Sequence, residues 1–200
     1  MAKTARLPSE ERRKQIVRAG LELCRTAGIS ALRTEKIAHK IGLSPGALFR
    51  HFSSKSEILQ GMADELIERL ESTVPEEEDP WRWIEQFVIR RARLLRDDPE
   101  VRLLFSDGFI MALPEETQED VHQEFSRTWR RLTEQIKRAQ DAGHIRADLQ
   151  THELAAAVAG LVQSVLHPPI GNVPEWSEPE AVWKTVQDLL SERAGATTNP

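Results

Sequence analysis

Apolar residues in the first quarter of the chain recur every three or four positions, the period of an amphipathic helix, and predict three consecutive helices. The first begins at the N-cap Ser9 and stops at Gly28; the second covers about 34–41 with Thr34 as its cap; the third covers about 45–51. The buried stripe of the first helix is predicted at Ile16, Ala19, Leu23 and Ala27. Two short helices joined by a turn that contains Gly form a helix-turn-helix, and its second helix fits a DNA major groove.

The third helix has clear start signals and a clear inward face. Ser44 is its expected N-cap, and Pro45 takes the first helical position, where a missing N–H costs nothing. Leu48 and Phe52, four residues apart, point inward. The side chains left outside are Gly46, Ala47, Phe49, Arg50 and His51.

Helical periods continue to the C-terminus, and no segment alternates as a strand would. The longer helices are expected at about 54–72, 80–96, 115–142, 152–166 and 179–192. The prediction is an all-α protein of about nine helices, with a three-helix helix-turn-helix DNA-binding domain at 1–55 and a helical ligand-binding and dimerisation domain at 56–194. Residues 195–200 are expected to be a disordered tail.

Charge is divided unequally between these two parts. Residues 1–55 carry 12 Lys or Arg against 4 Asp or Glu, and residues 56–200 carry 15 against 28, so a net charge of −5 hides a basic front and an acidic body. A basic segment that is also the helix-turn-helix indicates binding to a polyanion.

Composition argues against three classes of protein: disulfide-bonded, metal-binding and membrane-spanning. The single cysteine, Cys24, is expected to be a small buried hydrophobe, since it can form neither an internal disulfide nor a thiolate metal site. The histidines show no ligand spacing, so no metal or cofactor is expected. No apolar run approaches 18 residues, the length of a membrane span, and the N-terminus lacks a signal-peptide core, so the expected location is the cytoplasm, without membrane association.

Residues on and after the third helix are the expected DNA contacts. Gly46 and Ala47 let the backbone approach base edges, Arg50 reaches guanine or phosphate, His51 donates to a phosphate, and Lys55 places a charge near the DNA backbone. Basic residues of the first helix off its buried stripe are expected to meet phosphates as well: Arg12, Arg13, Lys14 and Arg18.

The order Thr-x-x-Ile-Ala-x-x-x-Gly-Leu-Ser-x-Gly-x-Leu-Phe-x-His-Phe-x-x-Lys over residues 34–55 resembles the DNA-binding signature of the TetR/AcrR transcriptional regulators. The resemblance runs from Ile16 to Leu59. It implies that Arg33 and Thr34 touch the duplex, and Ser44 belongs to the same expected set of DNA contacts. One residue departs from the family. Phe49 stands where a Tyr is usual, so this ring offers apolar contact in place of a phenol-to-phosphate hydrogen bond.

A hydrolase motif overlaps this segment. Gly42-Leu43-Ser44-Pro45-Gly46 matches the G-x-S-x-G nucleophile elbow, but that elbow follows a strand, and here the preceding residues have a helical period. Pro45 would also remove the N–H that such an elbow places in its oxyanion hole. With no nucleophile–base pair elsewhere, the chain is predicted not to be an enzyme.

Bulky apolar residues of the acidic body have two interpretations: ordinary core packing, or, as the family resemblance implies, the lining of a small-molecule cavity. The candidate ligand-binding residues are Phe87, Arg91, Phe105, Phe109, Met111, Phe125 and Trp129. Arg91 lies on an apolar stripe, where it either extends to solvent, pairs with a carboxylate, or neutralises an acidic ligand.

Residues 152–166 are apolar nearly all round, so this helix must be covered on every side. We expect it to form, together with helix 179–192 through Val182, Val186, Leu190 and Trp183, half of a four-helix bundle across a two-fold axis. Burial inside one monomer is the alternative. The predicted function is a homodimeric DNA-binding regulator, a repressor that a small molecule releases from a palindromic operator. The alternative is a ligand-independent regulator whose C-terminal domain docks a protein partner.

Overall fold

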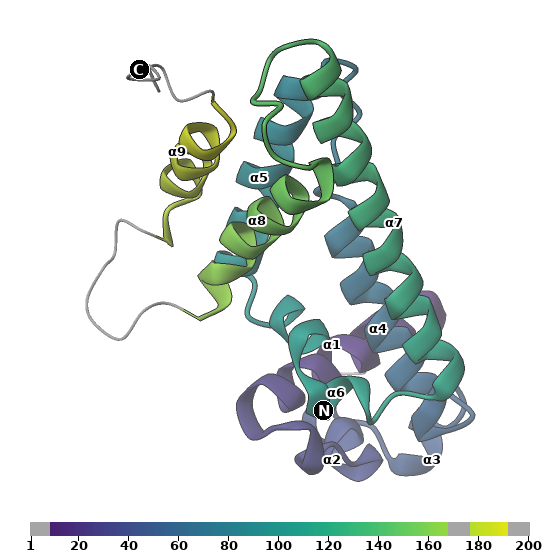
Figure 1. The fold of residues 1–200 in the computed structure, drawn as a ribbon. Coiled ribbons are helices and arrows are strands. Elements are labelled where there is room, and N and C mark those ends of the chain that lie inside the picture. The colour runs from purple at the N-terminus through teal and green to yellow at the C-terminus, as the bar shows by residue number, and fades with distance from the viewer. Residues whose placement is uncertain (1–8, 168–176, 192–200) are drawn as a thin grey trace, which may run out of the picture. The chain divides into compact units, whose positions relative to one another are not determined.

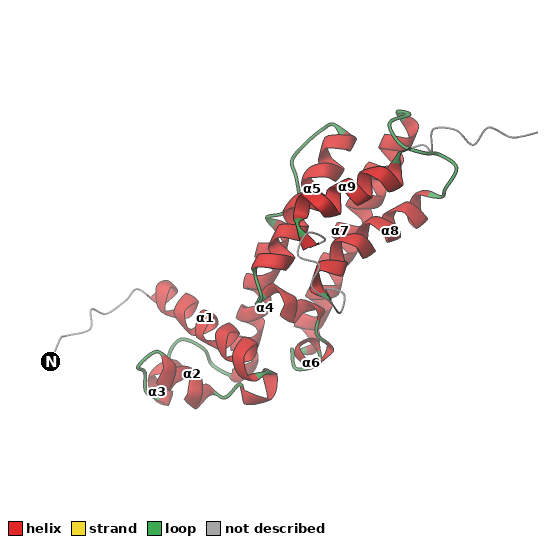
Figure 2. Cartoon of the chain, turned by 90° about the vertical axis from the view of Figure 1, so that its left-hand side faces the viewer, coloured by secondary structure: helices red, strands yellow, loops and turns green. Residues whose placement is uncertain are grey.

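The computed structural model describes residues 9–167 and 177–191, and within those ranges every regular element is a helix (Figure 2). The predicted tail at 195–200 lies outside them. The nine α-helices of the described part are α1 Ser9–Ala27, α2 Thr34–Lys40, α3 Pro45–Leu48, α4 Lys55–Glu71, α5 Pro80–Asp97, α6 Asp107–Ile110, α7 Glu115–Asp141, α8 Thr151–Gln163 and α9 Pro179–Leu190 (Figure 1). None of the described helices combines the length and apolarity that a membrane crossing needs. The all-α prediction is confirmed.

The chain divides into two compact units. The head unit contains the residues up to 69 together with 99–122, and the body unit contains 70–98 together with the residues from 123 onward. Helices α4 and α7 each contribute residues to both units. The predicted domain boundary at residue 55 stays a prediction.

The head unit begins with the helix-turn-helix, in which α2 ends at a glycine-based cap. Gly42 has φ +69°. The Leu43 N–H donates to the Ala38 carbonyl at 2.8 Å and the Gly42 N–H donates to the His39 carbonyl at 3.2 Å. This pair of bonds is a Schellman motif, which needs a left-handed residue at the glycine position. The turn into α3 is therefore specified by Gly42.

Three local predictions in this unit were wrong in detail. The buried arc of α1 passes through Leu21 and Cys24 instead of Leu23, which is half-buried, and Ala27, which is exposed, because α1 is covered along the line of Ile16 and Gly20. The N-cap of α2 is the extended residue Arg33, and Thr34 is already helical. The α-helical part of α3 stops at Leu48, after which residues 49–51 continue as a tighter turn.

Helix α7 buries polar residues beside its apolar ones. Val121, Leu132, Ile136 and Ala139 are buried, but Trp129 is 39% exposed and Phe125 is half-buried. Thr117 and Glu124 are buried instead, both 2% exposed. Near the middle of α7 the buried position is therefore 124 and not 125, and the buried carboxylate of Glu124 has hydrogen-bond partners in the body unit.

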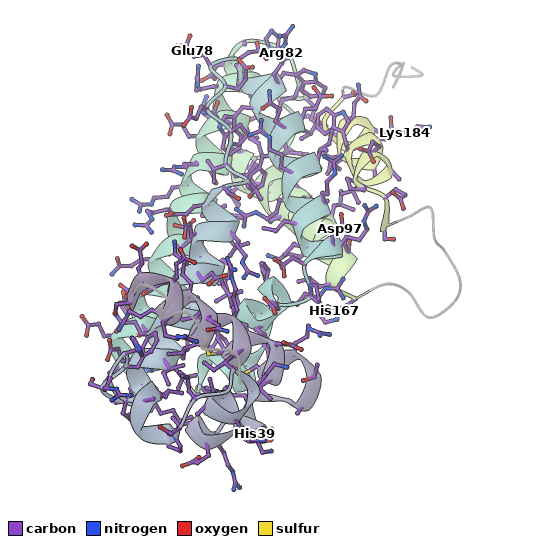
Figure 3. The ribbon with its side chains drawn as sticks, turned by 180° about the vertical axis from the view of Figure 1, so that it is seen from behind. His39, Glu78, Arg82, Asp97, His167 and Lys184 are labelled. Atoms are coloured by element: carbon purple, nitrogen blue, oxygen red, sulfur yellow. The ribbon has the colours of Figure 1, made fainter. Side chains whose placement is uncertain are left out.

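Helix α9 packs inside the body unit and does not offer the apolar face predicted for dimerisation. Val182, Val186 and Leu190 are at most 3% exposed, and Trp183 is 8% exposed beside Trp81, with ring centroids 5.2 Å apart. Figure 3 shows Lys184 on the outer side of α9, among the exposed polar residues of that helix. In contrast, Ala156 and Gly160 of α8 are exposed, so the described part of the chain covers this helix only partly. Its N-cap is Gln150, in a capping box with Glu153.

Cys24 is 3% exposed, as predicted, and burial raises the pKa of its thiol to about 11 despite the nearby charge of Lys55. Since the thiolate is the reactive form, the folded protein is expected to react with iodoacetamide at pH 8 at least about 100-fold more slowly than the urea-unfolded chain. Mass spectrometry of quenched time points measures both rates. Equal rates would contradict the buried, neutral thiol.

Candidate nucleic-acid interface

The face of α3 that does not contact the head-unit core is open. Leu48 is fully buried and Phe52 is 1% exposed, so these two side chains anchor the segment. The Ser44 hydroxyl oxygen accepts from the Ala47 N–H at 3.2 Å, which confirms the predicted N-cap. Outside this anchor, Phe49 is 45% exposed. A large apolar side chain that is exposed in this way is available for contact with a binding partner.

The predicted DNA contacts are all at least partly accessible. The exposed members are Arg33, Ser44, Gly46, Phe49, Arg50 and Lys55, and the half-buried members are Thr34, Ala47 and His51. They lie at the start of α2, on α3 and in the turn that follows it, and at the start of α4. His39 of α2 is also exposed, and Figure 3 shows it projecting from the helix-turn-helix. Contact of each residue with DNA stays a prediction.

Arg13, one of the expected phosphate contacts, has partners within the head unit, and its contact with phosphate stays a prediction. Its Nη1 donates to the His51 carbonyl and, at 2.8 Å, to Oε1 of Glu57. Its guanidinium carbon lies 3.9 Å from the centre of the Phe52 ring, a cation–π distance. Arg13 therefore links α1 to the end of α3 and to the first turn of α4.

Glu57 receives this link and was absent from the predicted site. Its Oε2 accepts from the Ser53 N–H at 2.6 Å and from the Ser53 hydroxyl at 2.9 Å, and its own N–H donates to the Ser54 hydroxyl oxygen at 3.1 Å. The Ser53 bonds and Arg13 hold the pKa of Glu57 below its ordinary value of 4.5. The sequence signal was present, since Ser54-x-x-Glu57 is a capping-box pattern.

Gly42 and Gly46 lie four residues apart, but only Gly42 has a backbone conformation that disfavours a side chain. Gly42→Ala is expected to lower the free energy of unfolding by about 1 kcal/mol, because φ +69° is unfavourable for a residue with a Cβ. Gly46→Ala is expected to leave stability equal or raise it by up to about 1 kcal/mol, since a Cβ there meets no atom within 4 Å and Ala favours helix. Urea unfolding measures both variants. Effects of the same sign would contradict the turn geometry.

The predicted ligand-binding residues divide between the two units. Phe105, Phe109 and Met111 belong to the head unit, and Phe109 is buried whereas Met111 is 75% exposed. Phe87, Arg91, Phe125 and Trp129 belong to the body unit. Met111 and Trp129 are exposed apolar side chains, and Trp129 lines an open pocket of about 340 Å³, so a ligand-binding role for either residue stays a prediction. A common cavity for the full set stays a prediction.

Arg91 is 5% exposed, so it does not extend to solvent. Its Nε donates to the Thr73 hydroxyl at 2.7 Å, and its Nη2 donates to the Leu70 carbonyl at 3.0 Å. Burial lowers the pKa of Arg91 to about 10, partly opposed by the charge of Glu124. Leu70 lies in the last turn of α4, whose carbonyls have no partner within the helix. Arg91 therefore caps the C-terminal end of α4 with a cation, as the helix dipole favours.

Glu124 lies buried near this cation and is bonded on both oxygens. One oxygen accepts from the Thr128 hydroxyl at 3.0 Å, and the other accepts from Nε of Arg127 at 3.0 Å, with Nη2 of the same arginine at 2.8 Å in an ion pair. Burial and the neighbouring Glu124 raise the pKa of Glu71. The body unit thus contains a polar network that joins buried Glu124 to the exposed side chains of Arg127 and Glu71, and this network was not predicted.

A separate open pocket of about 640 Å³ lies in the body unit along the loop between α4 and α5. It is lined by Glu71, Ser72, Val74, Glu76, Glu77, Glu78, Gln86 and Arg90. None of these is a predicted ligand contact. Among the residues that the structure describes, no group of three or more His, Cys, Asp or Glu is arranged to hold a metal ion.

Sequence comparison finds relatives of the N-terminal part of the chain, which contains the helix-turn-helix. Residues 16–62 match the model of the bacterial regulatory proteins of the tetR family. The tetracycline repressor protein class A from transposon 1721 of Escherichia coli is 33% identical over 94 residues, which cover 46% of this chain and 41% of that protein. The chain thus spans less than half the length of that curated relative.

Two solved structures share the fold over almost their whole length. The tetR-family regulator PfmR from Thermus thermophilus has a TM-score of 0.69 at 23% identity, covering 87% of this chain and 95% of that one. AibR in complex with isovaleryl coenzyme A and operator DNA has a TM-score of 0.72 at 17% identity, covering 90% and 97%. These likenesses confirm the arrangement of an N-terminal helix-turn-helix followed by further helices.

Proposed function

This chain belongs to the tetR family of bacterial regulatory proteins, and from that premise we propose that it is a homodimeric transcriptional regulator, a repressor that a small molecule releases from a palindromic DNA operator. The observation that carries the proposal is the open face of α3. Gly46, Phe49 and Arg50 are exposed there, while Leu48 and Phe52 fix the segment from below. The family is one of regulators, in agreement with the prediction that the chain is not an enzyme.

DNA recognition would combine close backbone approach with phosphate contacts. Gly46 and Ala47 bring the start of α3 near base edges, and Phe49 offers its ring to a thymine methyl group. Arg33, Arg50 and Lys55 supply charge for phosphates. Because few of these side chains suit bidentate base reading, much of the specificity would come from DNA shape.

Selection of bound duplexes from a randomised pool tests the proposal. The enriched sequence is expected to be palindromic, and its affinity is expected to fall about 10³-fold or more between 50 and 200 mM salt, as for six or more phosphate contacts. Arg50→Ala should weaken binding, whereas Arg130→Ala, the same charge change on α7, should not. If the pool yields no enriched sequence, the DNA-binding proposal is wrong.

Dimerisation through α8 would place two heads on one duplex. Ala156 and Gly160 are exposed and lie one turn apart on α8, and small residues allow close helix approach. Two half-sites about 34–36 Å apart would then be read together. Since the apolar face of α9 is already buried within its own chain, we assign the contact mainly to α8 and to the outer side of α9.

The effector would act through the position of the two heads. In the AibR structure a coenzyme A thioester and operator DNA are both present, which supports a regulator that combines the two kinds of binding. In this chain α4 contributes to both units, so a ligand that prefers one position of α4 would change the spacing of the heads. If a compound that raises the unfolding temperature left duplex affinity unchanged, this coupling would be excluded.

Arg91 remains the proposed partner for an acidic effector, with Phe87 beside it at 5.2 Å from ring centroid to guanidinium carbon. Binding of anionic compounds that Arg91→Ala does not affect would remove this role. The alternative function is a ligand-independent regulator whose body unit docks a protein. It predicts duplex binding that no small molecule changes.

A further inference from the structure

The recognition helix α3 is too short to hold its own orientation. It contains four residues, Pro45–Leu48, and an isolated helix of this length is unstable. Leu48 and Phe52 bury its inner side, but two buried side chains on one line still leave rotation about that line. Besides the packing of α3 against α2, the orientation of the exposed face therefore depends on contacts made at its C-terminal end.

Those contacts come from α1 and α4. The Arg13 guanidinium donates to the His51 carbonyl at the end of the turn that follows α3, and it covers the Phe52 ring. The Ser9 hydroxyl lies 3.4 Å from Nδ1 of His51. The backbone after α3 is thus attached to the side of α1 by side-chain contacts at His51 and Phe52.

Glu57 completes the arrangement from the other direction. One of its oxygens accepts from Arg13 and the other from Ser53, two residues beyond His51. The carboxylate is therefore joined at once to α1 and to the loop between α3 and α4. Arg13 binds the carbonyl of His51 and Glu57 binds the amide of Ser53, so the two ends of the segment 51–53 are held by two oppositely charged side chains.

We propose that Arg13 and Glu57 are positioning residues, which hold α3 in the orientation in which it meets DNA and do not themselves bind the DNA. This inference rests on the proposed function. It reverses the usual expectation for both residues. An arginine on a DNA-binding domain is normally a phosphate contact, and a glutamate there normally weakens binding by repulsion.

Glu57→Gln separates the two interpretations by the sign of its effect. Removal of a negative charge beside DNA should strengthen binding, but loss of the link to Arg13 should weaken it. We expect binding about threefold weaker for Glu57→Gln. The matched control is Glu35→Gln, an exposed glutamate in the first turn of α2, which should bind equally well or up to about threefold more tightly.

Arg13 is tested with two replacements. Arg13→Met and Arg13→Lys should both weaken binding, the former about tenfold, because one or two residues after α3 must then be ordered during binding. The salt dependence should stay as in the wild type, since no phosphate contact is lost. A phosphate contact would be kept largely by lysine, and its loss in Arg13→Met would lower the salt slope by about 0.9 for each subunit.

The experiment measures affinity for the duplex that the wild-type chain enriches from a randomised pool, at several salt concentrations. Circular dichroism confirms that each variant is folded at the temperature used, so that lost stability does not appear as lost affinity. Tighter binding by Glu57→Gln, or wild-type affinity in Arg13→Lys with a reduced slope in Arg13→Met, would overturn the inference alone. Failure of the wild type to enrich any duplex would instead overturn the proposed function, and the inference with it.

Discussion

Replacing Arg91 by alanine is expected to lower the free energy of unfolding by about 3 kcal/mol. The guanidinium is 5% exposed and donates to the Thr73 hydroxyl and to the Leu70 carbonyl, so its removal takes away two hydrogen bonds of a buried charged group, although the Thr73 hydroxyl still donates to the Leu70 carbonyl. Glu124 also loses the favourable field of a nearby cation. Hydrogen bonds from a charged group contribute about 1.5–3 kcal/mol each. Urea unfolding of the full chain measures the difference.

Arg93→Ala is the matched control for this effect. Arg93 lies two residues further along α5, is 52% exposed, and pairs with the exposed carboxylate of Glu180. Such a surface pair contributes at most about 1 kcal/mol. Arg91→Lys should fall between the two, because lysine keeps the charge but lacks the fork that reaches both acceptors. Equal losses for Arg91→Ala and Arg93→Ala would show that the cap on α4 contributes nothing.

Replacing Gly160 by aspartate is expected to convert the proposed dimer into a monomer and to weaken binding to the selected palindrome about 100-fold or more. Gly160 is exposed, and a Cβ added there meets no atom within 4 Å, so the fold of one chain should tolerate the change. In a two-fold arrangement around α8, however, two carboxylates would face each other where small residues approach. The second head would then no longer bind as part of one assembly.

Sedimentation and duplex binding, measured on the same preparation, check this expectation. Ala147→Asp adds the same charge at an exposed residue of the loop between α7 and α8, and it should change neither mass nor affinity. A Gly160→Asp protein that stays dimeric would exclude α8 as the contact. A monomer that keeps full affinity would exclude the requirement for two heads.

Much of the head unit could be predicted because its signals are local. Ser44 caps α3, Pro45 takes the first helical position, and Gly42 supplies the left-handed turn, each acting on neighbours within five residues. Leu48 and Phe52 followed from the helical period. The exposure of Phe49 and Arg50 followed in turn, since the opposite side of α3 was already assigned to the core.

The errors in the body unit concern which side chains are buried, and they share a cause. Trp129 was expected to be a core or cavity residue, and the burial of Glu124 was not predicted, because the sequence distinguishes the faces of α7 by hydrophobicity alone. In the structure Glu124 has Arg127 and Thr128 as partners, and a paired carboxylate can be buried where an unpaired one cannot. Likewise, the apolar face of α9 packs within its own chain. Helical periodicity predicts that this face is buried, but it does not indicate whether the same chain or a second copy covers it.

The amino-acid order alone was enough to predict the helices, the N-cap of α3 and the basic helix-turn-helix with its exposed recognition face, because these depend on period, turn chemistry and charge within short segments. Only the packed chain decided that Arg13 joins Glu57 and the end of α3, that Arg91 caps α4, and that α8 keeps an uncovered side. Those features join residues as far apart as 13 and 57, and their partners are selected by distance in space, which spacing along a chain does not contain.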